Sequence, residues 1–139
     1  MKNHILPHDH GKNIHKILEK MPCTKEFATV SDLFRLLGDF SRMRIFWILC
    51  HCEECVINLS AITEMTSPAV SHHLKLLKSA GLVESRRDGK EVYYKAVNSN
   101  EVMLLHDMLE EMIENQSEKG RYTGLCERIR ELGTGCWKE

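Results

Sequence analysis

Three cysteines near the middle of the chain carry the most evident chemistry of this sequence. In the segment ILCHCEECVINL, Cys50, Cys52 and Cys55 lie within six residues, with His51 between the first two. Thiolates bind soft and borderline ions such as Zn²⁺, Cd²⁺, Pb²⁺ and trivalent arsenic. We therefore expect a metal site at these cysteines, although C-x-C-x-x-C is not the pattern of a zinc finger. The alternative is that Cys50 or Cys52 packs as a small hydrophobic side chain.

A further ligand for this site would have to come from a distant segment or from another chain. Cys126 and Cys136 are ten residues apart and form no second close pair. The candidates in or beside the polar N-terminal segment are His8, His10 and Cys23, together with His4 and His15. A remote interpretation is enzymatic, because Cys52-x-x-Cys55 has the spacing of a dithiol oxidoreductase pair. The βαβ context of that motif is absent, so we expect no enzyme.

A helix with one polar face follows the cysteines. Ser67 is predicted to cap it, with Pro68 at its first position, and Gly81 is predicted to end it. Its apolar stripe consists of Val70, Leu74 and Leu77. The opposite side carries short, polar or cationic residues, as a helix that enters a major groove requires. The candidate DNA-binding residues are Ser67, Pro68, Ser71, His72 and Lys75.

A β-hairpin is predicted directly after this helix. Asp88-Gly89 is a strong two-residue turn signal between LVESRR and KEVYYKAV. Arg86, Arg87 and Lys90 crowd its tip, from which cations can reach phosphates. Residues 67–95 hold six Lys or Arg against three Asp or Glu, while the whole chain has a net charge of −1. This locally basic face fits a DNA-binding protein that must also release its site.

The remaining pattern predicts five more helices around this helix and hairpin. Phe27, Val30, Phe34 and Leu37 recur at helical spacing up to Gly38. Asp39 is predicted to cap a second helix, and Asn58 a short third one. A broad apolar helix is expected over residues 99–117, and another in the tail around residues 122–132.

Length and composition place these elements in one small intracellular protein. A chain of 139 residues suits a single core. It contains no apolar run long enough for a membrane span, and its first residues lack the core of a signal peptide, so we expect a cytoplasmic protein with free thiols. We expect a flexible arm over residues 1–22, a DNA-binding and dimerisation domain over residues 23–118, and a tail over residues 119–139 with a short helix.

Three segments resemble the ArsR/SmtB family of bacterial repressors: SPAVSHHLKLLKSAGLV, DGKEVYY and LLGDFSRMRIFWIL. The resemblance covers about residues 27–113. It implies a winged helix-turn-helix, mainly α with a small β-hairpin wing, that binds operator DNA as a homodimer. In the family the first and last helices form the dimer interface, and the corresponding candidates here are Phe27, Val30, Leu105, Leu109 and Met112.

The resemblance also implies a repressor that leaves its operator when it binds its inducer. The family's thiolate sensors pair cysteines near the third helix with ligands from the N-terminal arm. Here Cys55 falls on the first position of the family's cysteine box, and Ile57 occupies the second. Some relatives instead sense oxidants or persulfide through two cysteines. For that alternative the partner of Cys50 would have to be Cys126, Cys136 or a near neighbour of Cys50.

The family's other metal site, on the last helix, uses Asp and His ligands. Those positions hold Asn98, Asn100, Glu111 and Glu114, so we do not expect that site. His106 and Glu110 stand one turn apart on the same helix. We interpret His106 as a histidine at the surface or at the dimer interface, and metal binding by His106 and Glu110 is the alternative. The pattern does not choose the metal, the operator or the regulated genes.

Overall fold

The computed structural model describes residues 5–116, which form two units that divide between Asp32 and Leu33. The first unit contains α1 (Ile14–Lys20), a helix with no buried residue. It also contains the beginning of α2 (Thr24–Leu37). The arm that the sequence predicts over residues 1–22 therefore includes a short helix that the pattern did not indicate. The helix expected up to Gly38 is confirmed as α2.

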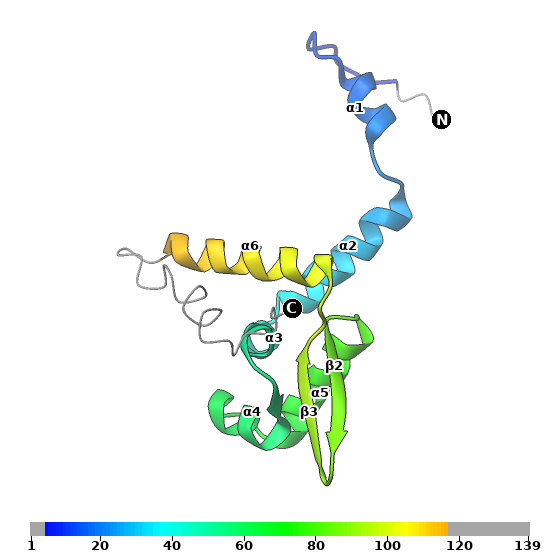
Figure 1. The fold of residues 1–139 in the computed structure, drawn as a ribbon. Helices are drawn as coiled ribbons and strands as arrows, with labels where there is room; N and C mark the ends of the chain where they lie inside the picture. The colour runs from blue at the N-terminus through cyan, green and yellow to red at the C-terminus, as the bar shows by residue number, and fades with distance from the viewer. Residues whose placement is uncertain (1–4, 117–139) are drawn as a thin grey trace. The chain divides into compact units, whose positions relative to one another are not determined.

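The second unit is mainly helical with one small antiparallel sheet. Its elements are, in order, the end of α2, α3 (Phe40–His51), β1 (Glu54–Cys55), α4 (Val56–Thr63), α5 (Ser67–Ser79), β2 (Val83–Asp88), β3 (Glu91–Ala96) and α6 (Asn100–Gln116). The strands lie in the order β1-β3-β2. Figure 1 shows the β2–β3 hairpin extending away from α6, with α4 and α5 beside it. The predicted fold class, helices with a hairpin wing, is confirmed.

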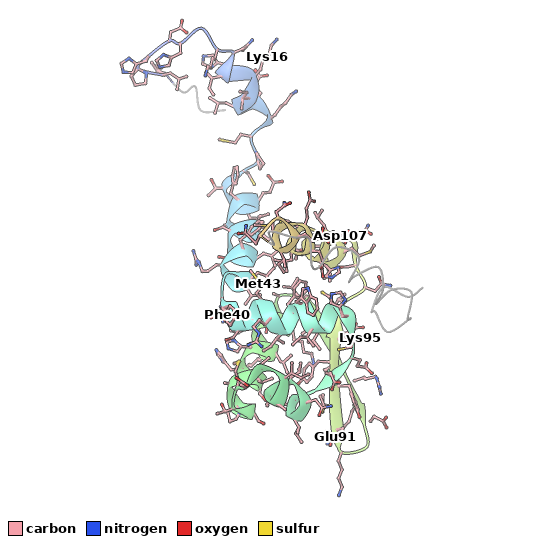
Figure 2. The ribbon with its side chains drawn as sticks, turned by 90° about the vertical axis from the view of Figure 1, so that its left-hand side faces the viewer. Lys16, Phe40, Met43, Glu91, Lys95 and Asp107 are labelled. Atoms are coloured by element: carbon pink, nitrogen blue, oxygen red, sulfur yellow. The ribbon has the colours of Figure 1, made fainter. Side chains whose placement is uncertain are left out.

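Helix α3 is the centre of this unit. Ile45, Phe46 and Leu49 are fully buried along it. Figure 2 shows α3 between α6 on one side and the pair α4–α5 on the other. The carboxylate of Asp39 caps α3, because its Oδ1 accepts a hydrogen bond of 3.0 Å from the backbone N–H of Arg42. This bond is the main cause that lowers the pKa of Asp39 below its usual value.

The structure corrects one predicted helix start and confirms another helix. Asn58 does not cap α4, which already begins at Val56 after Cys55 as its N-cap. Asn58 lies inside the helix, and its amide donates a 2.8 Å hydrogen bond to the Glu54 carboxylate. The helix expected over residues 99–117 is confirmed as α6. The predicted tail helix lies outside the described residues.

No helix within residues 5–116 combines the length and the apolar character that crossing a membrane would require.

Candidate nucleic-acid interface and a buried histidine–glutamate cluster

Helix α5 presents the predicted polar face outward and its apolar stripe inward. Val70, Leu74 and Leu77 are fully buried. The five predicted DNA-binding residues of this helix are all exposed: Ser67, Pro68, Ser71, His72 and Lys75. The helix begins one residue away from the predicted position, because Thr66 rather than Ser67 is the N-cap and accepts a hydrogen bond from the Ala69 N–H. Pro68 is accordingly the second helical residue, where a missing N–H is also tolerated.

The hairpin is present, but its turn lies one residue later than predicted. Asp88 pairs with Glu91, so the two turn residues are Gly89 and Lys90 rather than Asp88 and Gly89. Gly89 has a φ of 63°, a conformation that glycine adopts without strain. The turn therefore places the ammonium of Lys90 at the tip of the hairpin.

Arg86 is engaged within the protein. Its Nε donates hydrogen bonds of 2.9 and 3.0 Å to the two carboxylate oxygens of Glu53, and its guanidinium lies 4.9 Å from the centre of the Tyr93 ring. The hydrogen bond to Arg86 lowers the pKa of Glu53, and the same contact raises the pKa of Arg86. The pair joins the loop after α3 to the wing, which sequence patterns did not indicate.

Arg87 projects from the opposite face of β2, because successive side chains of a strand alternate. This is the face of Ser85, whose hydroxyl accepts a 2.7 Å hydrogen bond from the ammonium of Lys78 on α5. Arg87 and Lys90 are both exposed. Arg87, rather than Arg86, therefore lies on the side of the wing that carries α5, and Lys90 lies at its tip.

The three clustered cysteines occupy different environments. Cys50 is fully buried in the hydrophobic core. Cys52 is the C-cap of α3, and its Sγ donates to the Ile48 carbonyl at 3.5 Å. Cys55 is 8% exposed and pairs with Tyr93 in the sheet. These thiols do not form a set of three with ligand atoms within 4.8 Å of one another.

The further ligand candidates and the proposed redox partners of the cysteine cluster stay predictions. Cys23 is exposed, and His8 and His10 are exposed in the first unit. Cys126 and Cys136, the predicted partners for a redox pair, lie outside the described residues.

Within residues 5–116, one group of side chains has the geometry of a metal-ligand set: His51, His106 and Glu110. The Nε2 atoms of His51 and His106 lie 3.0 and 3.1 Å from Glu110 Oε1, and 3.1 Å from each other. His51 is 5% exposed, His106 0% and Glu110 8%. The indole N–H of Trp47 donates a 2.7 Å hydrogen bond to the same Oε1. Two imidazoles and a carboxylate therefore converge between α3 and α6.

This cluster corrects the interpretation of His106 as a surface or interface residue. His106 lies one turn after Val102 and three residues before Leu109, both buried, so its position on the apolar stripe of α6 could have indicated its burial. Its contact with His51, 55 residues earlier, has no local signal in the sequence. The pairing became visible only when the fold brought α3 and α6 together.

The predicted dimerisation residues divide into buried and exposed ones. Leu105 and Leu109 belong to the core of the chain itself. Phe27 and Val30 on α2 are 52% and 51% exposed, and Met112 on α6 is 57% exposed. Leu104, at 71%, is a further large apolar residue on the exposed side of α6. The exposed residues among these are the ones that a second chain could cover: Phe27, Val30, Leu104 and Met112.

Comparison with known proteins gives one family. A family model described as "Bacterial regulatory protein, arsR family" matches residues 39–85. An arsenical resistance operon repressor of Staphylococcus aureus is 30% identical over 89 residues, which are 64% of this chain and 78% of that protein. The cadmium resistance transcriptional regulatory protein CadC of Listeria innocua is 42% identical over 67 residues, 48% of this chain and 56% of CadC.

A solved structure of similar fold is a homodimer. It is the winged helix-turn-helix DNA-binding domain Mb0332 from Mycobacterium bovis, with a TM-score of 0.58 and 27% identity. The similarity covers 70% of this chain and 93% of that one.

Proposed function

Because the chain belongs to the ArsR family of bacterial regulatory proteins, we propose that it is a homodimeric operator-binding repressor that a metal ion or metalloid releases from DNA. The observation that carries the proposal is the orientation of α5, with one face buried and a polar face exposed. Its buried stripe fixes the helix in the core while Ser71, His72 and Lys75 face outward. Side chains of this size and polarity can reach base edges in a major groove.

The wing supports the same proposal. Arg87 on the side of α5 and Lys90 at the tip of the wing offer two cations per chain, which can contact the phosphates that flank the groove. A two-fold dimer would present two such units to a palindromic site. A solved relative of the same fold is described as homodimeric.

Selection of duplexes from a random DNA pool tests this proposal without a known operator. We expect reduced, metal-free protein to enrich a palindrome. His72→Ala should change the enriched bases, whereas Arg87→Ala should weaken binding to all duplexes alike. A folded protein that enriches no sequence would contradict the proposal.

The inducer is proposed to be a metal ion or metalloid because two relatives are described by cadmium and arsenical resistance. The thiol candidates for its site are Cys50, Cys52 and Cys55, with His8, His10 or Cys23 as further ligands. Their proximity in sequence supports this site. Their separation in the structure means that the α3–α4 loop would have to rearrange on binding.

Titration with zinc, cadmium, lead and arsenite, followed by fluorescence anisotropy of labelled operator, tests the release. We expect a variant with all three cysteines changed to serine to bind operator and to resist release by lead or arsenite. Normal release of that variant by both ions would remove these thiols from the sensor.

A further inference from the structure

We propose that His51, His106 and Glu110 form a second, thiol-free binding site for a divalent ion of zinc type, which joins α3 to α6. The regulatory part of this inference rests on the repressor function proposed above. The ion-binding part rests on the geometry of the cluster alone.

The cluster holds too few protons to satisfy all three of its contacts by hydrogen bonding. Three ligand atoms contact one another in a closed triangle with sides of 3.0, 3.1 and 3.1 Å. Each Nε2 carries at most one proton, and an ionised carboxylate oxygen carries none. If both rings donate to Glu110, their two protons face each other. If one ring donates to the other, the acceptor ring turns a lone pair toward Glu110. Hydrogen bonds therefore satisfy at most two sides of the triangle, whereas one cation satisfies all three corners.

The size of the triangle is close to one face of a tetrahedral zinc site. Zinc binds imidazole nitrogen and carboxylate oxygen at about 2.0 to 2.2 Å, so two ligand atoms of a regular tetrahedron are about 3.3 to 3.5 Å apart. The observed separations of 3.0 to 3.1 Å are within a few tenths of an ångström of that face. Side-chain rotation of this extent needs no change in the backbone.

Neighbouring side chains contact the three ligands and hold them in place. The Trp47 N–H holds Glu110 Oε1 at 2.7 Å, and the Trp47 ring lies 4.2 Å from that of His51. The Asp107 carboxylate lies 3.7 Å from Nδ1 of His106, close enough for an electrostatic contact. Oriented carboxylates and supported imidazoles are the usual surroundings of metal ligands. Asp107 is labelled on α6 in Figure 2.

One ligand of the buried cluster borders a surface groove, which is a route by which an ion could reach the site. Glu110 and Trp47 border a groove of about 500 Å³ that is otherwise mostly apolar. Phe40 and Met43, labelled in Figure 2, line the groove from the N-terminal half of α3. Two imidazoles and a carboxylate suit zinc, cobalt or nickel and lack the thiolates that lead and trivalent arsenic prefer.

Occupancy would pin the C-terminal end of α3 to the middle of α6. Helix α3 packs against α5, which carries the DNA-facing side chains, and α6 carries the exposed apolar residues that a partner could cover. An ion that binds one arrangement of these helices more tightly than another would shift the spacing of the two α5 helices in a dimer. Couplings of this kind change affinity by about 5- to 150-fold.

Cobalt(II) binding to the reduced full-length protein is the direct test, because cobalt reports its ligands in its absorption spectrum. A His8→Gln/His10→Gln background limits binding by the arm. We expect one cobalt per chain, with visible bands of a tetrahedral site and without the near-ultraviolet band of thiolate ligation. The spectrum should persist when Cys50, Cys52 and Cys55 are all serine. It should be lost in His106→Asn and Glu110→Gln, and kept in Glu111→Gln, which removes the same charge from the next residue.

Three outcomes would overturn the inference. A thiolate band that disappears in the triple serine variant would place the ion at the cysteines. Loss of binding in Glu111→Gln together with Glu110→Gln would point to general surface charge. No cobalt uptake by folded protein would leave the cluster as a hydrogen-bonded contact only. If the histidine and glutamate variants do not fold by circular dichroism, the spectra of the wild type and of the triple serine variant still decide between nitrogen and sulfur ligands.

Measuring operator affinity with and without zinc tests this inference separately from the repressor function. We expect zinc to lower operator affinity at least about tenfold in the wild type and in the triple serine variant, but not in Glu110→Gln. Operator binding without metal, followed by normal release of Glu110→Gln by zinc, would keep the repressor and refute the regulatory role of this cluster. Failure to bind any DNA would refute the repressor instead.

Discussion

Arg86 and Arg87 are adjacent in sequence but should contribute very differently to DNA binding. The guanidinium of Arg86 is already paired with Glu53, and Arg87 projects from the other face of β2, on the side of α5. Replacing Arg87 by alanine should therefore remove one phosphate contact per chain. Replacing Arg86 should remove none.

The magnitude follows from counterion release. Each phosphate contact contributes a slope of about 0.9 to the plot of log affinity against log salt. Loss of Arg87 should flatten that slope by about 0.9 per chain, or about 1.8 for a dimer on a two-fold site. At about 0.15 M salt this corresponds to about a fivefold loss of affinity per wing, or about 1 kcal/mol.

Fluorescence anisotropy over a range of potassium chloride concentrations measures both slopes, with Arg86→Ala as the matched control. Glu53→Gln checks that the ion pair is not required for folding, since an exposed pair of this kind contributes little to the free energy of unfolding. If Arg86→Ala and Arg87→Ala lower the salt dependence of affinity equally, Arg86 contacts DNA despite its ion pair with Glu53. That result would refute the prediction.

Three further predictions concern assembly and stability. Leu104→Asp should convert a micromolar dimer to monomers in sedimentation, because it places an unpaired charge in the proposed interface; a dimeric variant would exclude Leu104 from that interface. Asp39→Ala should lower the free energy of unfolding by about 1 kcal/mol at pH 7 in urea titrations. Because the folded pKa of Asp39 is lowered, its carboxylate stabilises the fold above the ordinary value of 3.8, and the difference from Asp39→Ala should shrink as the pH falls below it; a constant difference would argue against the charged cap. Leu74→Ala should cost about 2 to 5 kcal/mol without changing the polar face of α5, and a loss below 1 kcal/mol would contradict its place in the core.

Local signals in the sequence were sufficient for most helices and for the hairpin. The periodic burial of Val70, Leu74 and Leu77 and the glycine at residue 81 placed α5 to within one residue. The errors at Thr66 and Gly89 arose because neighbouring residues can serve the same local role. Thr66 and Ser67 can both cap a helix, and Asp88-Gly89 and Gly89-Lys90 both place glycine in the turn.

Contacts between distant segments were beyond the sequence pattern. The pairs Glu53–Arg86 and His51–His106 join residues 33 and 55 positions apart, and neither has a periodic signature. The cysteines attracted attention because they are close in sequence, yet their side chains project from a helix end, a cap and a strand. Proximity along the chain is therefore a poor measure of ligand geometry where secondary structure changes within a few residues.

The short strand β1 makes the wing more rigid than a two-stranded hairpin would be. An isolated two-stranded hairpin is only marginally ordered in water. Here β1 pairs Glu54 with Tyr94 and Cys55 with Tyr93, which adds a third strand beside the middle of the hairpin. The wing thus reaches DNA with much of its backbone entropy already lost during folding, so that binding has less freedom left to remove. Substitutions that weaken the pairing of β1 should then lower the association rate and the affinity for DNA, although the phosphate contacts stay the same.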